Sequence, residues 1–223
     1  MDQLDLVIFD LAGPTVEDHG QVPAAFTAAL AEQGIAVTPE QIRAVRGSSK
    51  RQALQQLIPA GPESSRLVEQ AHTQFRAHLA QRYSREGVRA IAGAEAAFQW
   101  LRARGVAVAL NTGFDRDITE LLLGALGWGA GMVQAVVCGE DVPQGRPAPY
   151  LIFRAMEQTG ARSVHRVANI GDTTLDLQAG YNAGVRWNIG VLSGAHDRQT
   201  LESAPHTHLL PSVADVLPFW ATA

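Results

Sequence analysis

The chain has 223 residues, of which 46% are hydrophobic and 18% are charged, and its formal net charge is −4. This balance is typical of a globular α/β protein, and the length allows one large domain or a domain with an insert. The charge offers no strong basic field for nucleic acid or an anionic membrane, and no apolar run reaches the roughly 18 residues of a membrane span. The acidic start lacks the basic region of a secretion signal. The single cysteine, Cys138, excludes an internal disulfide. We therefore expect a cytoplasmic protein with no nucleic-acid or membrane partner.

The first predicted element is a strand, an apolar run over Leu6–Phe9 that ends at the acid Asp10. Because ligands bind outside the carboxyl ends of parallel strands, Asp10 is expected to face the functional site. From about residue 21 to residue 83 the pattern favours helices and no strand. The helices expected there are Pro23–Leu30, one opened by Thr38 and Pro39, one capped by Ser48 or Ser49 that runs to Pro59, and Pro62–Tyr83.

From Gly93 onward, predicted helices alternate with predicted strands. The helices are Ala94–Arg104, Asp115–Leu126, Pro147–Thr159, Leu175–Ala183 and Ser212–Phe219. The strands are Val106–Leu110, Ala135–Val137, Val167–Ile170, Val185–Val191 and a short one near His208–Leu210. This alternation implies right-handed crossovers and a parallel sheet. We expect an α/β fold with a doubly wound parallel sheet and a helical insert after its first strand.

Polar clusters directly follow four of the predicted strands. They are Asp10, Thr112, Gly145–Pro147 and Gly171–Asp176. Each cluster alone would equally suit a turn. Together they supply a carboxylate nucleophile, a hydroxyl donor, a cation to oppose phosphate charge, and acids that could hold a divalent metal. The combination therefore indicates phosphoryl transfer.

In this order the clusters resemble the motifs of the haloacid dehalogenase superfamily, over essentially the whole chain. The matching residues are Asp10, Gly13 and Thr15 for the first motif, Thr112 for the second, Arg146 for the third, and Gly171, Asp172 and Asp176 for the fourth. The resemblance implies a Rossmann-like core formed by residues 1–14 and 90–223. It also implies that residues 15–89 form a mobile α-helical cap domain.

The resemblance further implies a Mg²⁺-dependent hydrolase in which Asp10 attacks phosphorus. Asp10, Asp172 and the backbone carbonyl of Ala12 would hold Mg²⁺, and Asp176 would orient the groups around the metal. Arg146 would bridge Asp10 and the phosphate. The residues expected to bind phosphate or substrate are Ala12, Gly13, Arg46, Asn111, Thr112 and Gly113.

Ala12 stands where the family's phosphatases carry the acid that protonates the leaving alcohol, a loss that typically costs about 10²–10⁴-fold in rate. The phosphonatase branch of the family has alanine there. It cleaves the carbon–phosphorus bond of phosphonoacetaldehyde after a cap lysine has formed a Schiff base with the aldehyde. Lys50 is the only lysine of the chain and lies three residues after Gly47, as in that branch. Gly145–Pro149 also matches the branch's Gly-Arg-Pro-x-Pro.

Several positions depart from the phosphonatase pattern. They are Pro14 for a threonine, Gln21 for a cysteine, Arg46 for a methionine, Ala53 for a proton-shuttling histidine, and Phe114 for a tyrosine. Since cap residues select substrates in this family, the substrate stays open between phosphonoacetaldehyde and a related phosphonyl aldehyde. One alternative is a small-molecule phosphatase acting on phosphate esters or acyl phosphates. A further alternative is a non-catalytic phosphometabolite-binding protein.

Two residues keep more than one interpretation. Lys50 would form an imine, bind the phosphoryl group by its charge, or start a solvated helix. His19, in the expected hinge, would replace the missing proton shuttle or stay solvated. In each case the expected partner is a small phosphorylated or phosphonate metabolite, and the chain would act as a monomer or homodimer.

Overall fold

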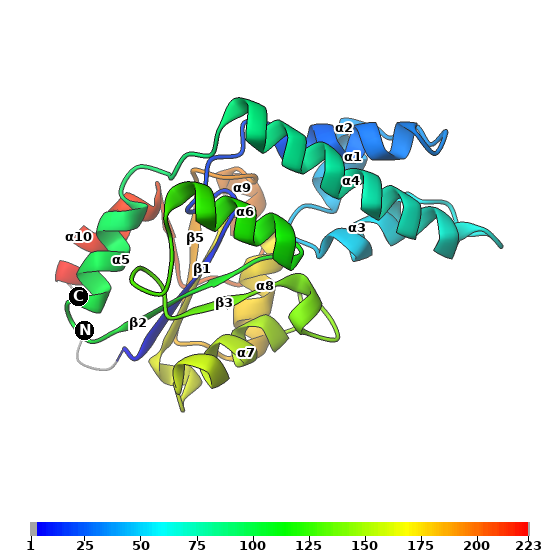
Figure 1. Ribbon diagram of the computed structural model, residues 1–223. Helices are drawn as coiled ribbons and strands as arrows, with labels where there is room; N and C mark the ends of the chain where they lie inside the picture. Colours follow the sequence, from blue (N-terminus) through cyan, green and yellow to red (C-terminus); the bar gives the residue numbers. More distant parts are fainter. Residues whose placement is uncertain (1–3, 223) are drawn as a thin grey trace.

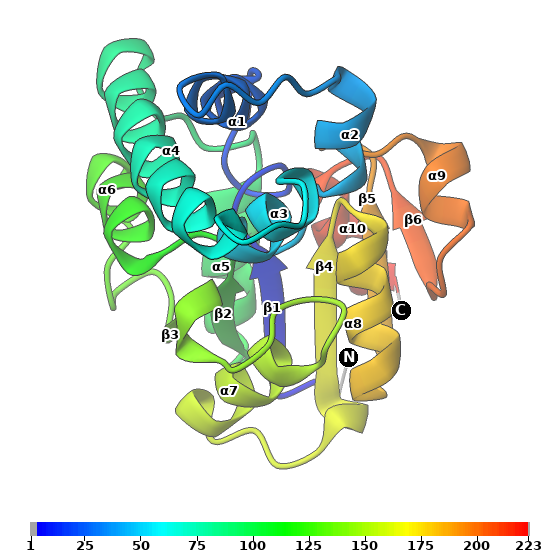
Figure 2. The ribbon, with the colours of Figure 1, turned by 90° about the vertical axis from the view of Figure 1, so that its right-hand side faces the viewer.

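The computed structural model describes residues 4–222, and in this part of the chain six parallel strands form one sheet (Figures 1 and 2). In chain order they are β1 (Leu6–Asp10), β2 (Ala107–Asn111), β3 (Ala135–Val137), β4 (Val167–Gly171), β5 (Trp187–Val191) and β6 (His208–Leu210). Their order across the sheet is β3-β2-β1-β4-β5-β6. The winding therefore reverses between β1 and β4, and such a switch point is where open α/β sheets bind ligands. The expected doubly wound α/β fold is confirmed.

Helices cover both faces of the sheet, and β1 is therefore buried on both sides. Alternate side chains point to opposite faces. Val7 and Phe9 belong to the larger apolar cluster, with α5 (Ala94–Arg102), α6 (Arg116–Leu126) and α10 (Val216–Thr222). Leu6 and Ile8 belong to the other, with α7 (Tyr150–Thr159) and α8 (Thr174–Ala183). The rings of Phe9 and Phe98 lie 5.1 Å apart, edge to face. Burial on both faces explains why this strand reads as a continuous apolar run.

The segment between β1 and α5 is helical, as expected. It contains α1 (Gln21–Ala31), α2 (Pro39–Ala44), α3 (Lys50–Leu57) and α4 (Ser64–Glu86), which we call the helical group. Figure 2 shows these helices above the carboxyl ends of the strands, with α3 over the tip of β1. The two connecting segments run side by side, since the amide of Glu17 donates to the carbonyl of Arg89 at 3.0 Å. The helical group is thus placed over the edge of the sheet where the polar clusters lie.

Some element ends differ from the sequence prediction. The expected helix Ser212–Phe219 is a 3₁₀ turn over Val213–Asp215 followed by α10, and α7 begins at Tyr150 because residues 145–148 form a turn. A short helix, α9 (Arg198–Glu202), was not expected; the Asp197 side chain caps it by accepting from the amide of Thr200 at 2.8 Å. Brief 3₁₀ turns also occur at Gly139–Asp141 and Val164–Arg166. None of the helices within residues 4–222 combines the length and apolar character that crossing a membrane requires.

Candidate active site

Asp10, the last residue of β1, lies at the centre of a buried polar cluster. Nη2 of Arg146 donates to Oδ1 of Asp10 at 2.7 Å, and Nε of the same guanidinium contacts Oδ1 of Asp176 at 2.8 Å. Arg146 also donates to the side-chain oxygen of Asn111, the last residue of β2. The arginine is only 3% exposed. One guanidinium therefore joins groups from β1, β2 and the start of α8, and fixes the orientation of the Asp10 carboxylate.

Asp172 follows β4 and completes a group of three buried acids. One carboxylate oxygen each from Asp10, Asp172 and Asp176 lies within 4.8 Å of the others. Oδ2 of Asp172 accepts from the amide of Ala195 at 2.6 Å, whereas its Oδ1 is buried without a hydrogen-bond partner among the described residues. A buried carboxylate oxygen without a donor is costly. Hard oxygen ligands around such an atom fit a divalent cation such as Mg²⁺.

The pKa values of Asp10 and Asp172 reflect their burial and the excess of negative charge in this cluster. Burial raises the pKa of Asp10 to about 6, although Arg146 opposes the shift. Burial, together with the negative charges of Asp10 and Asp176, raises the pKa of Asp172 well above its usual range. One arginine does not balance three carboxylates. A bound divalent cation would favour the ionised forms of these acids.

Lys50 is the first residue of α3 and reaches toward the strand ends from the helical group. Its backbone amide donates to the carbonyl of Gly113 at 3.1 Å. Its Nζ donates to the carbonyl of Ser48 at 3.4 Å and lies 4.6 Å from the centre of the Phe114 ring. Burial lowers the pKa of Lys50 to about 8, with Asp10 opposing and Arg146 adding to the effect. An amine with this pKa is partly neutral near pH 7, as a nucleophile must be.

The model of the haloacid dehalogenase-like hydrolase family matches residues 7–189, which include both the strand-end cluster and the helical group. The chain belongs to this family. It is 28% identical over 224 residues to the phosphonoacetaldehyde hydrolase of Bacteroides fragilis, covering 95% of this chain and 84% of that protein.

Two solved structures share the fold of this haloacid dehalogenase-like hydrolase. One is a phosphonoacetaldehyde hydrolase-like protein from Oleispira antarctica, with a TM-score of 0.85, 21% identity, and coverage of 99% of this chain and 92% of that chain. The other is a hydrolase from Pseudomonas syringae, with a TM-score of 0.84, 24% identity and 98% coverage of both chains. The arrangement of sheet and helical group is thus one that these solved structures share.

The hydrolase places most of the predicted site residues around one cavity between the strand ends and the helical group. Those that line it are Asp10, Ala12, Arg46, Lys50, Thr112, Gly113, Arg146 and Asp172. Asp176 and Asn111 lie behind this surface and contact Arg146. Gly13 packs against Asp172, since a Cβ on Gly13 would lie 2.2 Å from Oδ2 of that acid. Residues far apart in the sequence are therefore brought to one cavity.

His19 does not line the cavity. Its ring contacts Oε2 of Glu17 at 2.7 Å and its side chain is 64% exposed. This position agrees with the solvated interpretation of His19. Ala53, which stands where the phosphonatase branch has its histidine, is fully buried.

Sequence reasoning missed two parts of the site. Asp18, whose side chain is only 4% exposed, lines the cavity and forms an ion pair with Arg46. His196, expected at the surface or in packing, is buried beside Asp172, and its backbone amide donates to the carbonyl of that acid at 3.2 Å. Its Nδ1 accepts from the amide of Thr174 at 3.1 Å. The residues Ser193–Ala195 begin two positions after the predicted strand that ends at Val191, and they were the signal that could have identified this fifth strand end.

Proposed function

We propose that this hydrolase cleaves the carbon–phosphorus bond of a phosphonyl aldehyde, phosphonoacetaldehyde or a close relative, and that Lys50 forms an imine with the aldehyde. One observation carries the proposal: Lys50 and Asp10 line the same buried cavity, and the only lysine of the chain is the residue placed there. The burial that lowers the pKa of Lys50 supports a neutral amine. The similarity to phosphonoacetaldehyde hydrolases supports the substrate class.

Mg²⁺ would be held by Asp10, by Asp172 and by the backbone carbonyl of Ala12, with Asp176 as an outer group. The unpartnered Oδ1 of Asp172 supports this assignment. When bound, the metal would neutralise charge between the carboxylates and the phosphonate. The chain's own residues would do the rest: Arg146 orients Asp10, and Thr112, with the backbone of Asn111 and Gly113, binds phosphate oxygens. Oγ1 of Thr112 accepts from the amide of Phe114 at 3.1 Å, which leaves its hydrogen free to donate.

The covalent steps balance with one molecule of water consumed overall. The neutral amine of Lys50 adds to the aldehyde carbon, the adduct takes up one proton from solvent, and water leaves, which gives a protonated imine. A carboxylate oxygen of Asp10 then attacks phosphorus as the carbon–phosphorus bond breaks. The electron pair of that bond forms a carbon–carbon double bond, the imine electrons move to nitrogen, and an enamine results. Protonation at carbon and hydrolysis release the aldehyde from Lys50, and a second hydrolysis releases phosphate from Asp10.

This route explains why alanine is acceptable at position 12. The leaving group is a carbon whose electrons the imine accepts, so no side chain has to protonate a leaving oxygen. An acid at position 12 would have no task in the bond-breaking step. The departure from the general phosphatase motif therefore favours the imine route over ester hydrolysis.

The test is borohydride trapping with phosphonoacetaldehyde, followed by intact mass and peptide mapping, alongside phosphate release. We expect a reduced adduct on Lys50 and phosphate in the untreated reaction. Lys50→Met should give neither. Asp10→Asn should still be trapped but release no phosphate, because only the second step needs the carboxylate. Wild-type protein that gives neither adduct nor phosphate at saturating substrate would overturn the proposal.

A second candidate is a phosphatase for acyl or aryl phosphates, whose leaving groups need no acid. The observation that favours it is Ala53, which is buried where the phosphonatase branch has its proton-shuttling histidine. Lys50 would then only attract the phosphoryl group. Three results together would select this function. Wild-type protein and Lys50→Met would both hydrolyse acetyl phosphate, Asp10→Asn would not, and borohydride would trap no adduct.

A further inference from the structure

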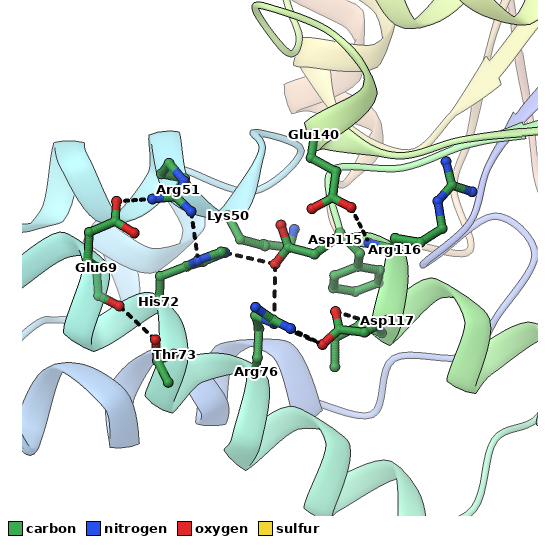
Figure 3. Close-up of polar contacts among 12 residues, drawn as sticks. Lys50, Arg51, Glu69, His72, Thr73, Arg76, Asp115, Arg116, Asp117 and Glu140 are labelled. Atoms are coloured by element: carbon green, nitrogen blue, oxygen red, sulfur yellow. Dashed lines mark hydrogen bonds and ion pairs between the residues drawn. The ribbon is translucent and has the colours of Figure 1, made fainter.

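A buried polar contact between a histidine and an aspartate joins the helical group to the sheet layer outside the cavity. Nε2 of His72 on α4 lies 2.8 Å from Oδ2 of Asp115, a close polar contact that lacks hydrogen-bond alignment, and the two side chains are only 5% and 14% exposed. One turn further along α4, Nε of Arg76 donates to Oδ2 of Asp117 at 2.9 Å. Figure 3 shows both side chains of α4 reaching toward the acids at the start of α6. The contact thus crosses between the two parts of the molecule.

The imidazole of His72 is held from both sides. Its Nδ1 lies 3.4 Å from Nη2 of Arg51 on α3, and Arg51 in turn pairs with Glu69 (Figure 3). Because a guanidinium donates and never accepts, Nδ1 is the acceptor and the proton of the neutral ring sits on Nε2, which faces Asp115. The orientation and tautomer of His72 are therefore set by neighbours from α3 and from the start of α6.

Within residues 4–222, the side chain of Asp115 contacts His72 and does not cap its own helix. Asp115 is the N-cap residue of α6, a position where an aspartate side chain usually accepts from the first turn of its own helix. In the described part of the chain its side chain makes no such cap bond, and it faces His72 instead. Burial opposes ionisation, but the contact with His72 and the charges of Arg76 and Arg51 hold the pKa of Asp115 below its ordinary value. The carboxylate is charged when the contact forms.

The contact between His72 and Asp115 lies next to the contact between Lys50 and Phe114. Arg51 follows Lys50 on α3, and Asp115 follows Phe114 on the loop after β2. Lys50 lies over the Phe114 ring, and one residue further along each segment Arg51 connects through His72 to Asp115. Since α3 and α4 pack on each other, a movement of α4 away from α6 would carry α3 with it.

We propose that His72 is a positioning residue, which fastens the helix that carries Lys50 to the loop that carries Phe114. With the pair formed, Lys50 is enclosed against the aromatic ring and the strand ends. Without it, the helical group separates from the sheet layer at this edge and water reaches Lys50. The consequence for turnover rests on the proposed function of Lys50, whereas the enclosure of its amine does not.

The test measures the amine of Lys50 directly, by trace acetylation with acetic anhydride across pH and peptide mapping. A single lysine makes the assignment simple, with the N-terminal amine as an internal reference. Burial lowers the pKa of Lys50 to about 8, so the labelling midpoint of the wild type is expected near that value. His72→Ala should move it upward by about one unit or more, toward the ordinary lysine value of about 10.4. His72→Gln keeps a donor toward Asp115 and should restore part of the shift.

His78→Ala is the matched control, because His78 lies on the same helix but contacts Glu32 at 2.6 Å inside the helical group. We expect its labelling midpoint to stay at the wild-type value. We also expect kcat for phosphate release to fall at least about 10-fold in His72→Ala, with a smaller change in KM, since the amine is misplaced after substrate has bound. A labelling midpoint in His72→Ala equal to that of His78→Ala would overturn the proposal.

Two further outcomes remain informative. If His72→Ala does not fold, Asp115→Ala takes its place, because it removes the acceptor that faces Nε2 of His72 and, among the described residues, no side-chain cap bond of α6 is lost with it; the same upward shift is expected, and its absence refutes the role. If wild-type protein gives neither phosphate nor adduct, the proposed function fails, and the labelling midpoint still decides whether His72 encloses Lys50.

Discussion

Gly194, three residues after the end of β5, is the residue whose replacement tests the geometry of the acid cluster most sharply. A Cβ built on Gly194 would lie 2.0 Å from Oδ2 and 2.4 Å from Cβ of Asp172. Carbon atoms in ordinary contact are about 3.5–4.0 Å apart. Because the second clash is with Cβ, next to the backbone of the loop after β4, rotation of the carboxylate alone would not relieve it. Gly194→Ala should therefore displace Asp172 or the 193–195 segment by about 1 Å.

Two magnitudes follow from this displacement. Overpacking a buried site typically costs about 1–3 kcal/mol. For a chain of this size each kcal/mol lowers the unfolding temperature by about 2–4 °C. A displaced Asp172 would also move away from Asp10, and disturbing the groups that orient metal ligands typically weakens metal binding by about 10–100-fold.

The assay is thermal unfolding of metal-free protein and of the same protein titrated with Mg²⁺. We expect Mg²⁺ to stabilise the wild type; Gly194→Ala should unfold at a lower temperature and need at least about 10-fold more Mg²⁺ for half of its own stabilisation. Gly124→Ala is the matched control, because Gly124 lies in α6 with open space around it, and alanine there should stabilise the helix by about 0.5–1 kcal/mol. An unfolding temperature and a Mg²⁺ midpoint both at wild-type values would refute the packing argument.

Other predictions concern buried charge. Folding raises the pKa of Asp10 from about 3.9 to about 6, so the native state binds more protons in this window and the metal-free protein should lose stability as pH rises from about 4 to 6. Asp10→Asn should therefore raise the unfolding free energy at pH 7 by about 1–3 kcal/mol in urea titrations, and a decrease would contradict this. Arg146→Met should act oppositely and cost about 3–5 kcal/mol, since it leaves Asp10 beside Asp176 without a cation; an unchanged urea midpoint would show that the pairs are not stabilising. Burial raises the pKa of Cys138 to about 11, so iodoacetamide at pH 8 should modify it in urea and leave it intact in the folded protein, as mass spectrometry would show.

Much of the fold was predictable because its signals are local. The apolar run before Asp10, the proline and capping box at Thr38, and the alternation of helix and strand after Gly93 each depend on residues close together in the chain. Parallel strands place their carboxyl ends at one edge of a sheet, and this rule alone brings Asp10, Thr112 and Asp172 together. The second half of the first motif, with Ala12, and the position of Lys50 after Gly47 were likewise visible in the sequence.

What the sequence could not decide depends on how the helical group sits on the sheet. The burial that lowers the pKa of Lys50, the pairing of Arg46 with Asp18, and the contact of His72 with Asp115 all join segments that no local pattern relates. His72 belongs to an amphipathic helix whose periodicity shows that this face is buried but not against what.

The sequence by itself thus determined the strand ends, the order of the polar residues around them and the chemistry those residue types allow. The tertiary structure alone decided which acids share one guanidinium partner, which oxygen of Asp172 is left without a donor, and which aromatic ring lies against Lys50. The physical reason is that periodicity and turn chemistry act between neighbours along the chain. Burial and ion pairing act between segments that are distant in the chain, and these segments are in contact only because the helical group packs over the sheet.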